Sequence, residues 1–177
     1  MILHEHDQPA VSLSEIITNP NLLFDDVFKN IEALKINLEG LILDHLGYRC
    51  FSTDEYLQIS RSLSVNGLAK LISEDQVRGR RIAVFELTQP IMSHGFKIDC
   101  VEIIEPKQGD ANKYSHQLEH AEFVLTEKSL QEFAEQHPHI DFDRTDMNRP
   151  NNPELRIKLQ SGRTIGFHTI ALIEYVT

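Results

Sequence analysis

The order of predicted secondary-structure elements repeats within this 177-residue chain, and that repeat constrains the fold more than any other feature. The first copy is a strand, a helix and three strands, predicted at 41–51, 52–63, 67–74, 80–87 and 96–105. The second copy follows the same order, at 118–125, 126–137, 140–147, 154–160 and 164–170. A repeated unit of this kind indicates a duplicated module.

The repeat extends to residue types. The first strand contains the triplet LDH, which ends at His45, and the matching strand contains LEH, which ends at His120. We therefore predict an α+β fold in which two βαβββ modules, 41–106 and 107–177, pair around a cleft. A helical segment precedes them at 1–40, because Phe24, Phe28 and Ile31 recur at helical spacing.

Helix ends and turns follow from individual residues. Pro20 suits the first turn of a helix, and Ser52 is predicted to cap the helix that follows the first strand. Thr126 is the expected N-cap of the matching helix in the second copy. Gly79 is expected to form the turn between two strands of the first module.

Composition excludes several classes of protein. With 41% hydrophobic and 25% charged residues the chain is typical of a globular protein, and its net charge of -10 argues against nucleic acid as a partner. The only basic cluster is RGRR at Arg78–Arg81, which we interpret as a solvated turn, with anion binding as the alternative. Cys50 and Cys100 form no C-x-x-C pair, so a cysteine-rich zinc site is not supported.

Nothing in the sequence indicates a membrane. No run of about 18 apolar residues occurs, and the first ten residues do not have the pattern of a signal peptide. We therefore expect a cytoplasmic protein. Two modules in one chain make a monomer sufficient, and a dimer stays open.

The predicted strands carry histidines on the face opposite their apolar residues. Alternation puts His45 on the same face as Gly47 and Arg49, with Leu46, Tyr48 and Cys50 on the covered face. In the second module His120 lies beside Glu122, and alternation turns Glu119 away from both. His168 shares a face with Gly166 on the last strand.

The strand at 96–105 offers two carboxylates. Glu102 alternates with Ile98, Cys100 and Ile104, a set typical of a core face, whereas Glu105 lies on a mixed face. We therefore favour Glu105 over Glu102 as the acidic partner of the histidines. Three imidazoles and a carboxylate suit a divalent transition metal such as zinc, nickel, iron or manganese. Structural, hydrogen-bonded roles are the alternative for each histidine.

Several segments resemble the YecM-like family, a branch of the vicinal oxygen chelate superfamily of glyoxalase, bleomycin-resistance and extradiol dioxygenase relatives. They are LDHLGYRC, GRRIAVFEL, IEPKQGDANKY, LEHAEFVL and SGRTIGFH, and the resemblance runs from about Phe24 to the end. It implies paired βαβββ modules and a divalent metal held by His45, Glu105, His120 and His168. Many members of the superfamily have a glutamate at the position of His168, so the histidine is a departure.

Three functions follow from this resemblance. The first is a metal-dependent isomerase, lyase or dioxygenase that acts on a small, anionic, oxygen-rich molecule. In that enzyme Glu122 is the expected general base and Arg49 the partner of an anionic substrate group. The second is a metal-free protein that binds a small molecule with the same fold. The third is a structural or regulatory domain whose amino-terminal helices bind a partner.

Overall fold

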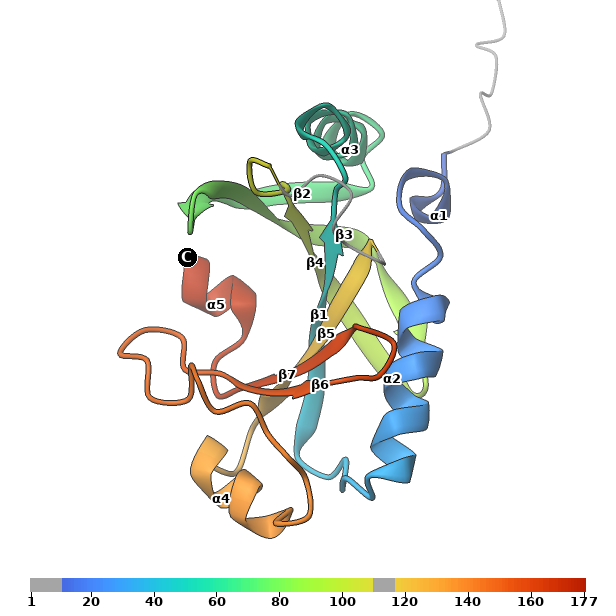
Figure 1. Cartoon of the computed structure of the whole chain (residues 1–177). Helices are drawn as coiled ribbons and strands as arrows, with labels where there is room; N and C mark the ends of the chain where they lie inside the picture. The colour runs from blue at the N-terminus through green and yellow to red at the C-terminus, as the bar shows by residue number, and fades with distance from the viewer. Residues whose placement is uncertain (1–10, 110–116) are drawn as a thin grey trace, which may run out of the picture.

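One seven-stranded mixed sheet organises the computed structural model, which describes residues 11–109 and 117–177 (Figure 1). The strands are β1 (Leu41–Arg49), β2 (Ala69–Val77), β3 (Arg80–Ser93), β4 (Phe96–Ile104), β5 (Leu118–Leu125), β6 (Leu155–Lys158) and β7 (Thr164–His168). The helices are α1 (Leu13–Ile16), α2 (Asn21–Ala33), α3 (Thr53–Val65), α4 (Leu130–Gln136) and α5 (Leu172–Val176).

The two predicted copies meet at the centre of the sheet. The strand order is β2-β3-β4-β1-β5-β7-β6, so the opening strands β1 and β5 are neighbours and run antiparallel. In each half the opening strand pairs in parallel with the last strand, β1 with β4 and β5 with β7. We call β1–β4 with α3 the first half, and β5–β7 with α4 the second half.

The sheet curls into an open arc, as Figure 1 shows, with α2 on the outer side and α5 inside the opening. Leu46 and Tyr48 of β1, and Cys50 directly after it, are buried in the same apolar core as Phe24 of α2. This confirms the apolar face predicted for the first strand. Because that face is used for the core, His45, Gly47 and Arg49 are left for the inner side of the arc.

Local sequence explains most helix ends and turns. The Ser52 hydroxyl accepts a hydrogen bond from the backbone N–H of Glu55 at 3.1 Å, which caps α3 as predicted. Pro20 lies directly before α2. Gly79, with φ of 81°, forms the tight turn between β2 and β3. In the second half the capping residue is Ser129, which forms a capping box with Glu132, so the prediction of Thr126 was wrong.

The second half contains one strand fewer than predicted. Of the segment 140–147, only Asp143 pairs with the sheet, through an isolated bridge to Arg156. The Asp143 carboxylate accepts hydrogen bonds from the backbone N–H and hydroxyl of Thr145, at 3.0 and 2.6 Å. This local turn competes with extended pairing and explains why the alternating pattern does not form a strand. Among the described residues, no helix is both long and apolar enough to cross a membrane.

Candidate metal centre

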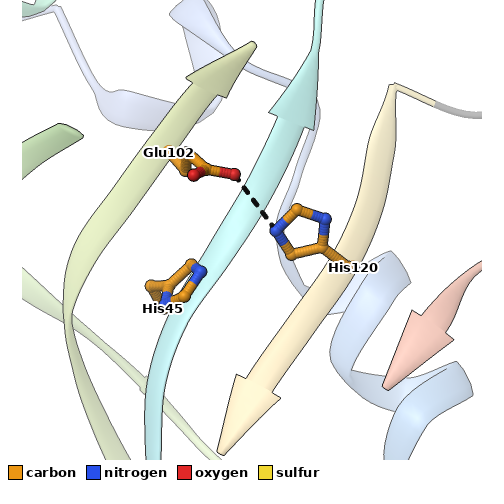
Figure 2. A group of neighbouring side chains, drawn as sticks. All are labelled: His45, Glu102 and His120. Carbon is orange, nitrogen blue, oxygen red and sulfur yellow. Dashed lines mark ion pairs between the residues drawn. The ribbon is translucent and has the colours of Figure 1, made fainter. Parts of the chain in front are cut away.

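Three neighbouring strands bring His45, Glu102 and His120 together on the inner side of the arc. Figure 2 shows the three side chains directed toward one another from β1, β4 and β5. The Nε2 atom of His120 lies 3.4 Å from Oε2 of Glu102, and the two imidazole rings are perpendicular with centroids 5.7 Å apart. One ligand atom from each of the three residues lies within 4.8 Å of the other two.

His45 and His120 each follow an acid that has no partner residue in the pairing of β1 with β5. Pairing passes from Leu43 directly to His45 on β1, which leaves out Asp44, and from His120 directly to Leu118 on β5, which leaves out Glu119. Such a bulge redirects side chains that strict alternation would place on the other face. The prediction that Glu119 turns away was therefore wrong.

Both acids consequently lie next to the imidazole that follows them. Asp44 Oδ2 lies 2.8 Å from Nδ1 of His45, and Glu119 Oε1 lies 3.8 Å from Nδ1 of His120. A carboxylate on Nδ1 fixes the ring so that Nε2 faces inward, which is the usual support for a metal-binding histidine. The LDH and LEH triplets contained this signal, which reasoning from alternation alone missed.

Two glycines make room for the inward side chains. A Cβ atom on Gly47 would lie 2.1 Å from Cε1 of His120, and a Cβ atom on Gly166 would lie 2.8 Å from Cγ of Glu122. Neither distance is tolerable for real atoms. The backbone of β1 and β7 must therefore be bare at these positions for His120 and Glu122 to occupy their places.

The residues present fit a divalent transition metal. The Nε2 atom of His120 is buried and has no well-formed hydrogen bond among the described residues, and its nearest charged neighbours are the carboxylates of Glu102 at 3.4 Å and Glu122 at 3.7 Å. Leaving a buried polar nitrogen in this state costs free energy, and coordination would remove that cost. Two imidazole nitrogens and a carboxylate oxygen match the donor preferences of zinc, nickel, iron and manganese.

Glu122 lies between all three histidines. Its Oε2 is 3.4 Å from Nε2 of His45, its Oε1 is 3.7 Å from Nε2 of His120, and it also contacts Nε2 of His168. Burial alone would raise the pKa of Glu122, but the positive charges of His168 and His45 hold it below its ordinary value. Glu122 is therefore an ionised carboxylate surrounded by imidazoles.

His168 lies behind Glu122. Its Nδ1 lies 3.2 Å from the carbonyl oxygen of Pro153, and its Nε2 contacts Glu122. Burial lowers the pKa of His168, yet the charge of Glu122 and its hydrogen bond outweigh burial and raise it. Both ring nitrogens have partners, which suits a doubly protonated imidazolium that orients Glu122.

A second group of potential ligands consists of Glu122, Glu154 and His168, whose ligand atoms also lie within 4.8 Å of one another. Burial and the neighbouring charge of Glu122 raise the pKa of Glu154 to about 7. The sequence analysis missed Glu154, which begins the strand predicted at 154–160 and lies directly before β6, because no histidine is near it in the sequence.

Glu105 lies outside the centre, and the preference for it over Glu102 was wrong about placement. Its carboxylate accepts hydrogen bonds from Nη2 and Nε of Arg81, at 2.9 and 3.0 Å, and from the Thr53 hydroxyl at 2.8 Å. These hydrogen bonds, that of Arg81 above all, lower the pKa of Glu105 to about 2. The face of β4 that carries Glu102 also carries apolar residues and forms a wall of the cleft. Apolar content alone could not distinguish a cleft wall from the core.

Arg49 is also committed to another protein group. It is buried, and its Nη2 donates a hydrogen bond to Oε1 of Glu119 at 2.6 Å, while Nε contacts the other oxygen. Burial would raise the pKa of Glu119, but the hydrogen bond from Arg49 helps to lower it. The guanidinium that was expected to meet a substrate anion is paired within the protein.

A cavity of about 180 Å³ connects these groups. At about 30 Å³ per liquid water, this volume holds roughly six waters, so it suits a small ligand. Residues from both halves of the sheet line it, together with Leu172 of α5. The backbone N–H of Leu172 donates to Oδ2 of Asp44 at 2.9 Å, which ties α5 to the acid that supports His45.

Known structures share this architecture. A structural genomics chain described as "Protein EC4020" has a TM-score of 0.69 at 23% identity, covering 88% of this chain and 86% of that one. Streptomyces coelicolor methylmalonyl-CoA epimerase, in complex with 2-nitronate-propionyl-CoA, has a TM-score of 0.52 at 15% identity, covering 75% and 96%. These similarities show that this chain shares the fold of methylmalonyl-CoA epimerase.

Sequence comparison identifies the family. "Protein YecM" of Escherichia coli strain K12 is 30% identical over 93 residues, which are 52% of this chain and 47% of that protein. The alignment thus spans about half the length of this curated relative. The family model described as "YecM protein" matches residues 12–177, almost the whole chain. This chain therefore belongs to the YecM family.

Proposed function

We propose that this chain is a divalent-metal-dependent enzyme of the vicinal oxygen chelate type, acting on a small, anionic, oxygen-rich molecule. The observation that carries the proposal is the group of one ligand atom each from His45, Glu102 and His120 within 4.8 Å of one another, in which the buried Nε2 of His120 makes no hydrogen bond. The sheet backbone gives up a side chain at Gly47 to admit that ring. Isomerase, lyase and dioxygenase chemistry all remain consistent with this centre.

His45, Glu102 and His120 would hold the cation, which when bound supplies Lewis-acid polarisation of substrate oxygens. Asp44 and Glu119 orient the two rings from behind through Nδ1. Glu122 is the proposed general base, because it is an ionised carboxylate beside both ligand histidines. His168 positions Glu122 from the opposite side and is not needed as a ligand in this arrangement.

Two observations bear on the ligand class, the size of the enclosed site and the ligand of a protein with the same fold. The cavity of about 180 Å³ is below the range of about 300–1,000 Å³ that is usual for drug-sized ligands. A solved structure with the same fold is a methylmalonyl-CoA epimerase in complex with methylmalonyl-CoA, which supports a small molecule as the ligand class. The cytoplasmic location and the monomeric state stay predictions of the sequence.

Metal analysis of protein purified without a histidine tag tests the proposal. We expect near-stoichiometric zinc, nickel, iron or manganese by elemental mass spectrometry, and loss of that metal in His45→Ala and Glu102→Gln. His94→Ala and Glu105→Gln are matched controls, because His94 and Glu105 lie outside the cavity lining, and both should retain the metal. Glu122→Gln should retain it too if Glu122 is a base, whereas loss would make Glu122 a ligand.

A metal-free binding protein is the second candidate, and one observation favours it. Every histidine of the centre already has a carboxylate neighbour, such as Asp44 beside His45 and Glu122 beside His168. In that case the purified protein contains no metal, and added divalent ions leave its melting temperature unchanged. A cation that binds the folded state must raise the melting temperature by mass action.

A further inference from the structure

Four arginines besides Arg49 line the cavity that contains the candidate metal centre. We call Arg78, Arg80, Arg149 and Arg156 the arginine rim, since all four line this cavity together with His45 and Glu122. With Arg49, five of the chain's 17 lysines and arginines line a single cavity. This concentration is notable in a chain of net charge -10.

The rim is assembled from both halves of the sheet. Arg78 and Arg80 flank the turn between β2 and β3, Arg149 lies in the loop before β6, and Arg156 lies on β6. One buried acid, Asp146, holds three of them. Its Oδ1 lies 2.7 Å from Nη2 of Arg149 and 3.4 Å from Nη2 of Arg78, and its Oδ2 contacts Nη2 of Arg156.

Three guanidinium groups of the rim share two carboxylates. Asp146 contacts Arg78, Arg149 and Arg156, and Glu154 lies 3.2 Å from Nε of Arg156. Each guanidinium has five N–H donors, and a shared carboxylate engages only some of them. Arg78 and Arg149 also remain 56% and 34% exposed at their side chains, so they are accessible to a ligand.

Arg78 and Gly79 form the two-residue turn between β2 and β3. Their φ angles of 50° and 81° are both left-handed, as a hairpin turn of this length commonly requires. The sequence predicted an ordinary solvated turn for RGRR, with anion binding as the alternative. The structure confirms the turn and places two of its arginines in the lining of the cavity.

We propose that the arginine rim binds an oxyanion group, a carboxylate or a phosphate, at the end of the substrate that does not reach His45 and His120. The proposal rests on the proposed function only in assigning this oxyanion to the substrate of the metal centre. Guanidinium groups suit this task because their planar donor pairs match the oxygens of carboxylate and phosphate. Asp146 holds the arginines in place before the anion arrives, which limits the ordering that binding requires.

Calorimetric titration of chelator-treated, metal-free protein with inorganic phosphate, and separately with acetate, tests the rim at low ionic strength. We expect saturable binding of at least one probe, and the stronger probe distinguishes a phosphate from a carboxylate. Arg78→Gln and Arg149→Gln should each weaken binding by about tenfold or more, because each removes a charge-assisted hydrogen bond. Arg144→Gln is the matched control, since Arg144 lies exposed in the same loop outside the cavity lining.

Two further measurements keep the outcomes distinct. Thermal unfolding of every variant separates a folded protein that has lost its anion site from one that has lost its loop structure. His45→Ala should retain phosphate or acetate binding although it loses the metal, so failure of the metal centre does not imply failure of the rim. Equal affinities in Arg149→Gln and Arg144→Gln, or no binding of either probe to the wild type, would overturn the proposal.

Discussion

The two halves of the sheet present the same pair of residues, an acid followed by a histidine, but use the acid differently. In the first half Asp44 lies 2.8 Å from Nδ1 of His45 and also accepts the backbone N–H of Leu172. In the second half Glu119 lies 3.8 Å from His120, and its carboxylate is mainly committed to Arg49. Both halves have the bulge and the histidine, while the contacts of the supporting acids differ.

The halves differ in a second, complementary way. Gly47 on β1 pairs with Glu102 on β4, whereas Glu122 on β5 pairs with Gly166 on β7. Two residues after the histidine, the opening strand of the first half has a glycine and that of the second half has a carboxylate. The paired strand has the other residue type in each half, Glu102 on β4 and Gly166 on β7. Each half still contributes at least one imidazole and one carboxylate to the cleft, His45 and Glu102 from the first half and His120 and Glu122 from the second.

The largest difference between the halves should appear when each supporting acid is neutralised. Glu119→Gln removes the negative charge that accompanies the buried Arg49, and we expect about 3 kcal/mol loss in the free energy of unfolding. Asp44→Asn removes the carboxylate that is hydrogen-bonded to His45, and we expect the free energy of unfolding to fall by about 1 kcal/mol. Urea unfolding of both variants at neutral pH measures the two values.

An equal loss of unfolding free energy in Glu119→Gln and Asp44→Asn would show that the two acids stabilise the protein equally. That result would contradict the difference between the halves. Glu39→Gln is the control, because Glu39 is exposed and lies outside both the sheet and the centre. Its free energy of unfolding should stay within about 0.5 kcal/mol of the wild type.

The exchanged glycines give the next effect in size. Gly47→Ala places a Cβ atom 2.1 Å from the His120 ring, and we expect about 2 kcal/mol destabilisation together with displacement of the ring. Gly166→Ala meets only the flexible Glu122 side chain, at 2.8 Å, and should cost about 1 kcal/mol. Unfolding measurements give the stabilities, and metal content gives the placement of the ring.

Metal content is the sharper of these two readouts. Gly47→Ala should lose the metal because His120 is a proposed ligand, and Gly166→Ala should retain it because Glu122 is a proposed base. Retention by Gly47→Ala would contradict the assignment of His120 even if the variant were destabilised.

Much of the fold was predictable because hydrophobic alternation and the repeat both report on backbone order. The opening strands, the helix after each of them, and the histidines on the face opposite Leu46 and Tyr48 all followed from spacing. The segment 140–147 was mispredicted because a local hydrogen bond from Thr145 to Asp143 overrides its alternation.

The site was harder to predict for a different physical reason. Bulges at Asp44 and Glu119 depend on how two strands pair, which a single strand does not reveal. The choice between Glu102 and Glu105 depended on which face of β4 meets the cleft, and both faces contain apolar residues. Arg156 and Glu154 line the cavity because of the way the second half folds, which their positions in the sequence do not reveal.

Within the first half, the ion pair of Glu105 with Arg81 should make the stability of the protein depend on pH. Glu105 has a pKa lowered from 4.5 to about 2, chiefly by hydrogen bonds from Arg81. Its contribution to stability is fully present above about pH 4.5 and is lost as the pH falls toward about 2, because only the ionised carboxylate binds Arg81. Glu105→Gln should therefore lie below the wild type in free energy of unfolding at pH 6, and the gap should narrow steadily between pH 4.5 and 2. Urea unfolding at several pH values measures that gap, and Glu39→Gln provides the baseline for an exposed acid; a gap that stays constant with pH would show that Arg81 does not favour the ionised form of Glu105.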